Sequence, residues 1–285
     1  MSSIQHIAVV GGGTMGNGIA HIAAQSGFRT TLIDVNQAVL DKAKATIDKN
    51  LGRMVAKEKI TAEQHAQTMA RLGFATDLAS SVTDADLVVE AVNENFDLKR
   101  NIFTTLDASA PAHAILASNT SSISITKIAN ATSRPEKVIG MHFFNPVPMM
   151  RLVELVRGYK TSDEVADTIR ELSVTLGKEP VTVNDYPGFV SNRVLMPMIN
   201  EAIYCVYEGV ATPEAVDDVM KLGMAHPMGP LRLADFIGLD VCLAILNVLY
   251  EGFKDPKYRP CPLLVQMVDA NVLGDKTGQG FYKHG

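Results

Sequence analysis

A glycine-rich turn near the start of the chain constrains its fold more than any other feature. Residues 4–10 form an apolar, β-branched run that predicts a buried strand. The run ends at Gly11-Gly12-Gly13-Thr14-Met15-Gly16, which contains the pattern Gly-x-Gly-x-x-Gly. Residues 14–26 then predict a helix, and residues 30–33 predict a second buried strand that ends at Asp34. Strand, glycine turn, helix, strand and acid in this order are typical of a dinucleotide-binding βαβ unit.

Each glycine of this turn has a separate physical use. Gly11 permits the sharp turn after the strand, Gly13 lets the backbone approach a pyrophosphate, and Gly16 allows the helix to pack closely on the strand. Thr14 and Met15 lie in the first turn of the predicted helix, where unpaired backbone N–H groups can bind phosphate oxygens. We therefore expect the turn to hold the phosphates of a dinucleotide.

The acid at the end of the second strand selects among dinucleotides. Asp34 lies 18 residues beyond Gly16 (34 − 16), and its carboxylate can accept hydrogen bonds from the adenosine ribose hydroxyls. The same charge would repel a 2′-phosphate, so we expect NAD rather than NADP. FAD is a rival ligand for the same pattern, and the plainer interpretation is a structural glycine turn beside a surface aspartate.

The remaining pattern predicts a Rossmann-type α/β domain followed by a helical domain. Strand-like runs alternate with helix-like segments, the strands at 87–90, 114–118, 138–143, 151–156 and 181–183 and the helices including 36–59 and 96–108. This alternation predicts a doubly wound, mostly parallel sheet, to which the later strands add an antiparallel edge. The predicted domains are a dinucleotide-binding domain with a helical hairpin over 1–186 and an all-α domain over 187–285.

Short motifs predict where several helices begin and which of them is buried. Thr61-x-x-Gln64 and Thr161-x-x-Glu164 both fit the capping box, in which the two side chains bind backbone N–H groups at the start of a helix. Thr212 followed by Pro213 predicts another helix start. A single helix over 231–252 is apolar nearly all round, so we expect it in a domain core or at a subunit interface.

Composition and charge argue against several classes of protein. The 285 residues carry 26 basic and 31 acidic side chains, a net charge of −5, which argues against a nucleic-acid-binding protein. The three cysteines form no close pair, so neither a disulfide framework nor a cysteine-rich zinc site is expected. No Lys or Arg precedes Arg29, which argues against an export signal, and no apolar run is long enough to span a bilayer. The expected setting is the cytoplasm, without a membrane or a metal.

One of the seven histidines lies where a catalytic base is expected. Hydride transfer from an alcohol without a metal needs a base for the hydroxyl proton, and histidine titrates near neutral pH. His142 lies at the end of a predicted strand, where the sites of open α/β sheets form, and the rigid turn 143–148 follows it. Glu154 lies on the returning strand, where it could face His142 and fix its tautomer. The alternative is a structural histidine whose hydrogen bonds are satisfied.

Motifs along the whole chain resemble one enzyme family, the short-chain L-3-hydroxyacyl-CoA dehydrogenases. The similar segments are Ser118-Asn119-Thr120-Ser121-Ser122, Gly140-Met141-His142-Phe143-Phe144-Asn145-Pro146-Val147-Pro148, Pro187-Gly188-Phe189-Val190-Ser191-Asn192-Arg193, His226-Pro227-Met228-Gly229-Pro230 and Lys276-Thr277-Gly278-Gln279-Gly280-Phe281-Tyr282. Within this family, residues 237–260 resemble the bacterial enzymes that act on 3-hydroxybutyryl-CoA. Gly12 stands where the family often has Ala or Ser, a small change inside the turn.

The resemblance implies a reaction and a set of catalytic roles. The reaction is the NAD-dependent oxidation of an (S)-3-hydroxyacyl-CoA, such as 3-hydroxybutyryl-CoA, to the 3-ketoacyl-CoA, and the reverse. His142 would be the base in oxidation and the acid in reduction, and Glu154 would orient and support it. Ser121 and Asn192 would hydrogen-bond the substrate oxygens. The plainer role of Ser121 is the N-cap of a helix that begins before Ile123.

The same resemblance implies further contacts with the cofactor. Asn145 would hold the nicotinamide end or the surroundings of Glu154. Glu94, Lys99 and Lys276 match family positions near the riboses and the nicotinamide. These assignments rest on the resemblance and not on spacing.

Coenzyme A and a second subunit are the implied partners. Lys57 and Asn50 belong to the predicted helical hairpin and match positions that contact coenzyme A, although a solvated helix face would also explain the lysine. The C-terminal domain resembles the family's dimerisation domain, which implies a homodimer. Asn192, on the first helix of that domain, implies a cleft between the domains that closes around the acyl-CoA and excludes water.

Two other functions are compatible with the sequence. Relatives of the family act on carnitine or on sugar acids such as gulonate, and those substrates lack the coenzyme A tail that Lys57 would contact. A non-catalytic NAD-binding protein on the same scaffold is the other possibility. Such a protein would be expected to lack the base or its carboxylate, and His142 and Glu154 are both present.

Overall fold

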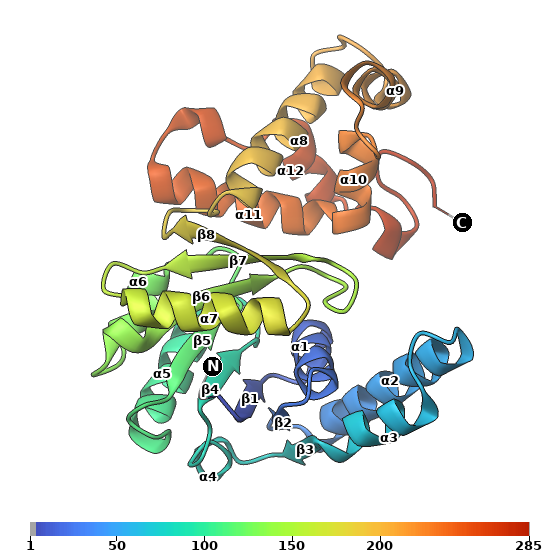
Figure 1. Ribbon diagram of the computed structural model, residues 1–285. Helices are drawn as coiled ribbons and strands as arrows, with labels where there is room; N and C mark the ends of the chain where they lie inside the picture. Colours follow the sequence, from blue (N-terminus) through green and yellow to red (C-terminus); the bar gives the residue numbers. More distant parts are fainter. Residues whose placement is uncertain (1–3, 285) are drawn as a thin grey trace. The chain divides into compact units, whose positions relative to one another are not determined.

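An eight-stranded sheet forms the centre of the first of two units, Met1–Asp185 and Tyr186–Gly285, in a computed structural model that describes residues 4–284 (Figure 1). The strand order is β3-β2-β1-β4-β5-β6-β7-β8. The strands are β1 (His6–Val10), β2 (Arg29–Ile33), β3 (Leu72–Ala75), β4 (Leu87–Glu90), β5 (Ile115–Ser118), β6 (Val138–Phe143), β7 (Leu152–Arg157) and β8 (Glu179–Asn184). All neighbours pair in parallel except β6 and β7, which confirms the predicted sheet with an antiparallel pair at its later strands.

Helices of the first unit connect these strands, and most begin at a polar capping residue. They are α1 (Thr14–Gln25), α2 (Gln37–Ala56), α3 (Ala62–Ala70), α4 (Leu78–Ser81), α5 (Phe96–Ser109), α6 (Ile125–Ala129) and α7 (Asp163–Thr175), with a 3₁₀ turn at Pro135–Lys137. The predicted capping box of Thr61 and Gln64 is present at α3. The second predicted box is wrong, because the side chain of Ser162 caps α7 and the Thr161 hydroxyl instead donates to the carbonyl of Val138, at 2.6 Å.

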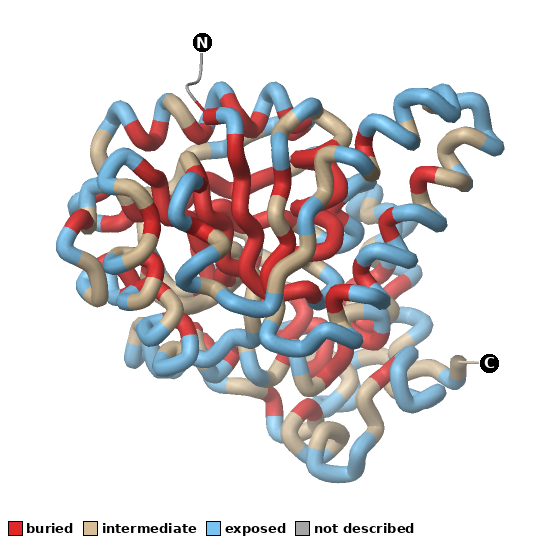
Figure 2. The backbone as a smooth tube through the Cα atoms, turned by 90° about the horizontal axis from the view of Figure 1, so that it is seen from below, coloured by how far each residue is buried: buried red, intermediate tan, exposed pale blue. Residues whose placement is uncertain are grey.

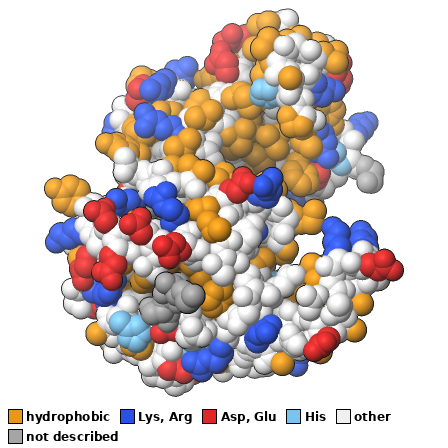
Figure 3. All heavy atoms as spheres, viewed as in Figure 1, with side chains coloured by type: hydrophobic (Ala, Val, Ile, Leu, Met, Phe, Trp, Pro, Cys, Tyr) orange, Lys and Arg blue, Asp and Glu red, His pale blue; other side chains and the backbone are white. Residues whose placement is uncertain are grey.

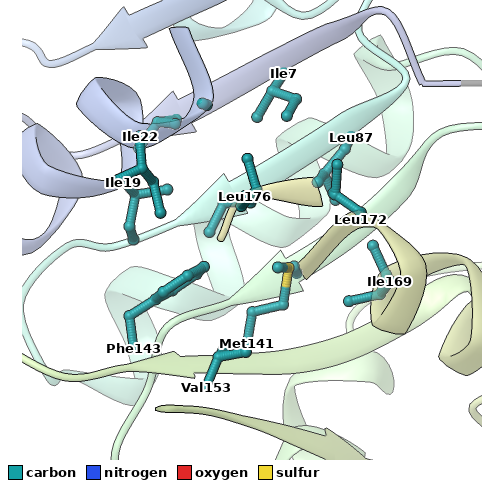
Figure 4. Packing of buried hydrophobic residues seen from close by; sticks show 14 of the residues in the cluster. Ile7, Ile19, Ile22, Leu87, Met141, Phe143, Val153, Ile169, Leu172 and Leu176 are labelled. Atoms are coloured by element: carbon teal, nitrogen blue, oxygen red, sulfur yellow. The ribbon is translucent and has the colours of Figure 1, made fainter. Parts of the chain in front are cut away.

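Buried aliphatic side chains hold the helices against the sheet. Figure 4 shows one such cluster, in which α1 and α7 contribute Ile19, Ile22, Ile169 and Leu172 and the strands contribute Ile7, Leu87, Met141, Phe143 and Val153. Every residue of β1 is buried, so both faces of this strand are covered, and Figure 2 shows the central strands in the colour of buried residues. Burial of alternate residues on both faces explains why these strands read as continuous apolar runs.

The second unit consists of helices, with one difference from the prediction. The helices are α8 (Ser191–Tyr207), α9 (Pro213–Met224), α10 (Pro230–Ile237), α11 (Leu239–Phe253) and α12 (Pro262–Asp269), with 3₁₀ turns at Pro256–Tyr258 and Asp275–Thr277. The single helix predicted over 231–252 is wrong: α10 and α11 meet at an angle of 99°. Gly238 separates them with φ +102°, a conformation that glycine adopts without a steric cost.

The short strand β3 was not predicted; three of its residues are partly buried and Gly73 is exposed. Among residues 4–284, no single helix is long and apolar enough to cross a membrane, whereas the bent pair α10 and α11 meets that length and composition only when both helices are counted together.

Candidate active site

The glycine turn after β1 has the shape that a pyrophosphate requires. Gly11 has φ +105°, and a Cβ atom there would lie 2.7 Å from the carbonyl oxygen of Ala91. A Cβ on Gly16 would lie 1.8 Å from the carbonyl oxygen of Gly11, so helix α1 can approach the turn only without a side chain. A Cβ on Gly13 would meet nothing within 4 Å. Two glycines are therefore demanded by packing, and the third faces open space beside the N-terminus of α1, where phosphate groups bind favourably.

Asp34, at the end of β2, forms one side of an apolar cavity. Its Oδ2 accepts a hydrogen bond from the backbone N–H of Gly12 at 2.8 Å, and its Oδ1 accepts one from Asn36 at 2.9 Å. The cavity measures about 460 Å³, and Asp34, Gly11 and Gly13 line it together with Val35, Val39, Leu78, Leu98 and Ile102. Apolar walls beside a carboxylate suit an adenine ring whose ribose hydroxyls donate to that carboxylate. Thr14 is exposed and Met15 half-buried in the first turn of α1.

The antiparallel pair β6–β7 brings a histidine and a glutamate together. His142 and Glu154 are directly opposite partners in the register, and both are buried. Nδ1 of His142 lies 2.7 Å from Oε2 of Glu154, so the ring nitrogen donates to the carboxylate. The ring also packs against Phe144, with 4.5 Å between ring centroids. A carboxylate in this position fixes the ring orientation and its tautomer.

A loop after β5 is organised around Glu94. Oε1 of Glu94 accepts hydrogen bonds from the backbone N–H of Ser121 at 2.9 Å and of Ser122 at 3.0 Å, and from the Thr120 hydroxyl. Burial would raise the pKa of Glu94, but the charge of Lys99 and these hydrogen bonds outweigh it and hold that pKa below its usual value. Ser121 is not the helix cap, because Ser124 caps α6. The Glu94 carboxylate therefore holds the backbone of this loop at Ser121 and Ser122.

Lys99 supports this loop from inside the protein. Its side chain is 1% exposed, and its Nζ lies 2.7 Å from Oε1 of Glu90 and 3.3 Å from Oε2 of Glu94. Glu90, at the end of β4, is fully buried and also accepts a 2.6 Å hydrogen bond from the Ser118 hydroxyl at the end of β5. Lys99 therefore contacts one carboxylate at the end of β4 and another in the loop that follows it, and its predicted proximity to the cofactor stays a prediction.

The turn between β6 and β7 is fixed by a second buried lysine. Lys178 donates through Nζ to the carbonyl oxygens of Val147 and of Met150, the latter at 2.8 Å. Burial lowers the pKa of Lys178. Asn145 is exposed in the same turn, beside Pro146. A charged group inside the turn holds the segment that follows His142 in one arrangement.

A basic cavity contains the residues predicted to bind coenzyme A. It measures about 310 Å³ and is lined by Asn50, Arg53, Met54, Lys57 and Lys59, from α2 and the turn after it, and by His21, Pro146, Pro148 and Met149. Figure 3 shows basic side chains at the end of the α2–α3 pair. We refer to this hollow as the basic cavity. Its mixture of apolar walls and cationic groups suits a ligand with both an apolar or amide arm and phosphate groups.

The two other predicted site residues belong to the second unit. Asn192 lies in the first turn of α8 and is buried. Lys276 lies in the 3₁₀ turn Asp275–Thr277, and its Nζ forms an ion pair with Asp240 of α11. The structure therefore places these residues on elements that the first unit does not contain, and their contacts with a ligand stay predictions.

The glycine turn, the acid after β2 and the strand order define a nicotinamide-dinucleotide-binding dehydrogenase fold. The comparisons with known proteins extend this assignment. The family model for the 3-hydroxyacyl-CoA dehydrogenase NAD binding domain matches residues 6–186, and that for the C-terminal domain of the same family matches residues 188–284. The chain belongs to the 3-hydroxyacyl-CoA dehydrogenase family, and NAD is its cofactor.

Similar proteins cover nearly the whole chain. The chain is 56% identical to a probable 3-hydroxybutyryl-CoA dehydrogenase of Deinococcus radiodurans, over 97% of this chain and 99% of that protein. It is 52% identical to a 3-hydroxybutyryl-CoA dehydrogenase of Bradyrhizobium diazoefficiens, over 99% and 96%. The solved structure of an (S)-3-hydroxybutyryl-CoA dehydrogenase from Ralstonia eutropha is 50% identical and superimposes with a TM-score of 0.96, over 99% of this chain and all of that one.

Several residues of the site were not anticipated from the sequence. Glu90 and Lys178 act through long-range contacts that no local motif signals, although an acid at the end of an apolar strand is an unusual feature that could have drawn attention to Glu90. Arg53 and Lys59 flank Lys57 in the basic cavity, and their clustering within seven positions was visible in the sequence.

Proposed function

We propose that the protein interconverts (S)-3-hydroxybutyryl-CoA and acetoacetyl-CoA, with His142 and Glu154 as the acid–base pair. The observation that carries the acid–base assignment is the 2.7 Å contact between a buried imidazole and a buried carboxylate at the end of β6. The substrate assignment is supported by relatives whose names specify 3-hydroxybutyryl-CoA and which match this chain over nearly their full length.

The residues divide the chemistry between them. NAD, when bound, supplies the hydride acceptor for oxidation and, when reduced, the hydride donor. Glu154 keeps Nδ1 of His142 protonated, so Nε2 takes the hydroxyl proton in oxidation and returns it to the ketone oxygen in reduction. The Glu154 carboxylate stabilises the imidazolium that forms. Ser121, on the loop organised by Glu94, donates a hydrogen bond to a substrate oxygen as its charge develops, and Asn192 is the second proposed donor to the substrate.

The basic cavity is the proposed site for the coenzyme A portion. Lys57, Arg53 and Lys59 supply positive charge for its phosphates, and the proline and methionine side chains supply an apolar surface for its arm. A carnitine or a sugar acid carries one carboxylate instead of several phosphates, so the three clustered cations favour an acyl-CoA over those substrates.

We also propose that the second unit forms a homodimer interface. Helices α9 and α10 expose large apolar side chains to solvent, with Leu222 85%, Val219 62% and Phe236 61% exposed. Figure 3 shows hydrophobic side chains gathered on this helical unit. Large exposed apolar side chains on one unit support a contact with another protein. A cytoplasmic location is a further prediction from the sequence.

The experiment that tests the proposed function is oxidation of NADH by acetoacetyl-CoA, followed as the loss of absorbance at 340 nm. We expect turnover with acetoacetyl-CoA and none with dehydrocarnitine or with an oxidised sugar acid. Matched reactions without the acyl-CoA control for background oxidation. If the protein binds NADH but reduces none of the 3-ketoacyl-CoA substrates, the proposed function is wrong.

Asp34→Ser is expected to weaken discrimination against NADPH. The variant removes the negative charge that would repel a 2′-phosphate. The serine hydroxyl oxygen can still accept the hydrogen bond that the Gly12 N–H now donates to Asp34. We expect the ratio of kcat/KM for NADH to that for NADPH to fall by at least about ten-fold, equal to about 1.4 kcal/mol. The measurement is the two kcat/KM values at saturating acetoacetyl-CoA. An unchanged ratio would remove Asp34 from cofactor selection.

A further inference from the structure

His21, on α1, is a buried polar side chain without a partner among residues 4–284. It is 1% exposed, and neither Nδ1 nor Nε2 has a hydrogen-bond partner in the described part of the chain. His6 provides a comparison, because it is 2% exposed and yet places Nε2 2.8 Å from the Thr31 hydroxyl and Nδ1 3.2 Å from the carbonyl of Asp84. A buried polar group without a partner is costly, so the position of His21 requires an explanation.

The imidazole lies in the wall of the basic cavity. It is the only histidine among the lining residues, and it comes from α1, whereas Asn50, Met54 and Lys57 come from α2 and its C-terminal end. Three further lining residues, Pro146, Pro148 and Met149, come from the turn whose carbonyl groups Lys178 contacts. His21 is thus built into the same hollow that we assign to coenzyme A.

The charge state of His21 selects which part of a ligand it can bind. Burial lowers the pKa of His21 to about 4, so the ring is neutral at pH 7. A neutral imidazole has one donor and one acceptor nitrogen and offers a phosphate no positive charge. A secondary amide has a complementary N–H donor and C=O acceptor. The cations Arg53, Lys57 and Lys59 are the groups suited to phosphate.

We infer that His21 is a specificity-determining residue that hydrogen-bonds an amide of the pantetheine arm of the acyl-CoA substrate. This inference rests on the proposed function and adds a residue to it. The ring nitrogens are closed off from solvent, so the arm reaches them as flexible side chains of the wall change rotamer. Met54 and Met149 are the unbranched, adaptable members of that wall. Within the cavity, the cations then bind the phosphates of the ligand and His21 binds its amide arm.

The test compares two thioesters, acetoacetyl-CoA and acetoacetyl-pantetheine, which lacks the phosphates and the nucleoside. We expect His21→Leu to raise KM for both by the same factor, about five-fold, the usual effect of losing one hydrogen bond between neutral groups. kcat and the KM for NADH stay unchanged. His21→Gln retains a donor and an acceptor and is expected to restore most of the affinity. The matched control Lys57→Ala raises KM for acetoacetyl-CoA alone.

Thermal unfolding without ligand separates binding from packing. Leucine replaces the unpartnered polar ring with an apolar side chain of similar size, so Tm of His21→Leu should equal or exceed that of the wild type. A folded His21→Leu with wild-type KM for both thioesters overturns the inference. A lower Tm, or failure to fold, assigns His21 to packing and also overturns it. If the wild type reduces neither thioester, the proposed function is wrong, and the inference about His21 is then wrong as well.

Discussion

His142→Gln is expected to lower kcat for acetoacetyl-CoA reduction by about 10³-fold, within the usual range for loss of a general acid. Glutamine can still donate to Glu154, so the strand pair β6–β7 keeps its contact. It has no nitrogen that can give up a proton near neutral pH. NADH binding should be unchanged, because the glycine turn and Asp34 lie on other strands. The measurements are kcat at saturating substrates and the Kd for NADH from fluorescence titration.

Glu154→Gln is the matched variant for the orienting role. A carboxamide can donate to Nδ1 of His142 and so favour the tautomer with the proton on the other nitrogen. We expect a fall in kcat of about 10²-fold or more, with the Kd for NADH unchanged.

A kcat of His142→Gln within a factor of ten of the wild-type value would contradict the first prediction. It would show that His142 is not the proton donor and that the reaction needs another acid.

Local rules predicted most of the cofactor half of the fold. The glycine turn, the helix after it and Asp34 are adjacent in the sequence, so each follows from short-range sterics and periodicity. The position of Glu154 opposite His142 also followed from chain order, because a short turn between two strands makes them antiparallel neighbours. Such features need no knowledge of distant contacts.

The errors come from competition that local patterns do not resolve. Thr161 and Ser162 are adjacent hydroxyl residues, and the structure uses Ser162 as the cap because Thr161 is engaged by the carbonyl of Val138 on a neighbouring strand. Likewise, apolar periodicity over 231–252 continues across Gly238, so only the backbone conformation of that glycine reveals two helices. The choice of capping residue depended on a tertiary contact, and the helix break depended on one backbone conformation; neither is visible in a local pattern.

Lys99→Met is expected to lower the free energy of unfolding by about 3–5 kcal/mol at pH 7, the usual cost of removing one partner of a buried ion pair. Lys99 is 1% exposed and Glu90 0%, so the substitution leaves a carboxylate in a site that water does not reach. Methionine matches the length of the lysine stem, so lost packing contributes little. The measurement is the unfolding midpoint and slope in urea.

The double variant Lys99→Met/Glu90→Gln is the control for the charge itself. It removes both charges at once; the glutamine oxygen can still accept from the backbone N–H of Val92, and its NH2 group can donate to the Ser118 hydroxyl oxygen. We expect it to recover at least half of the loss, because paired burial of charge brings little net stability. Equal destabilisation of the single and double variants would mean that the lysine stem, and not the ion pair, stabilises this site.

The single variant Lys99→Met also tests whether the buried charges stabilise the loop after β5 through Glu94. Lys99 helps hold the pKa of Glu94 below its usual value, so Glu94 adds stability above the ordinary glutamate pKa, and that stability is lost as pH falls through the lowered value. In Lys99→Met this acid-dependent loss is smaller. The stability difference between wild type and variant should therefore narrow as pH falls from 7 to 4.

A stability difference that stays constant over this pH range would mean that Lys99 acts through packing alone. A difference that narrows, together with a raised KM for acetoacetyl-CoA, would show that one ion-pair network both stabilises the sheet and positions Ser121 through Glu94.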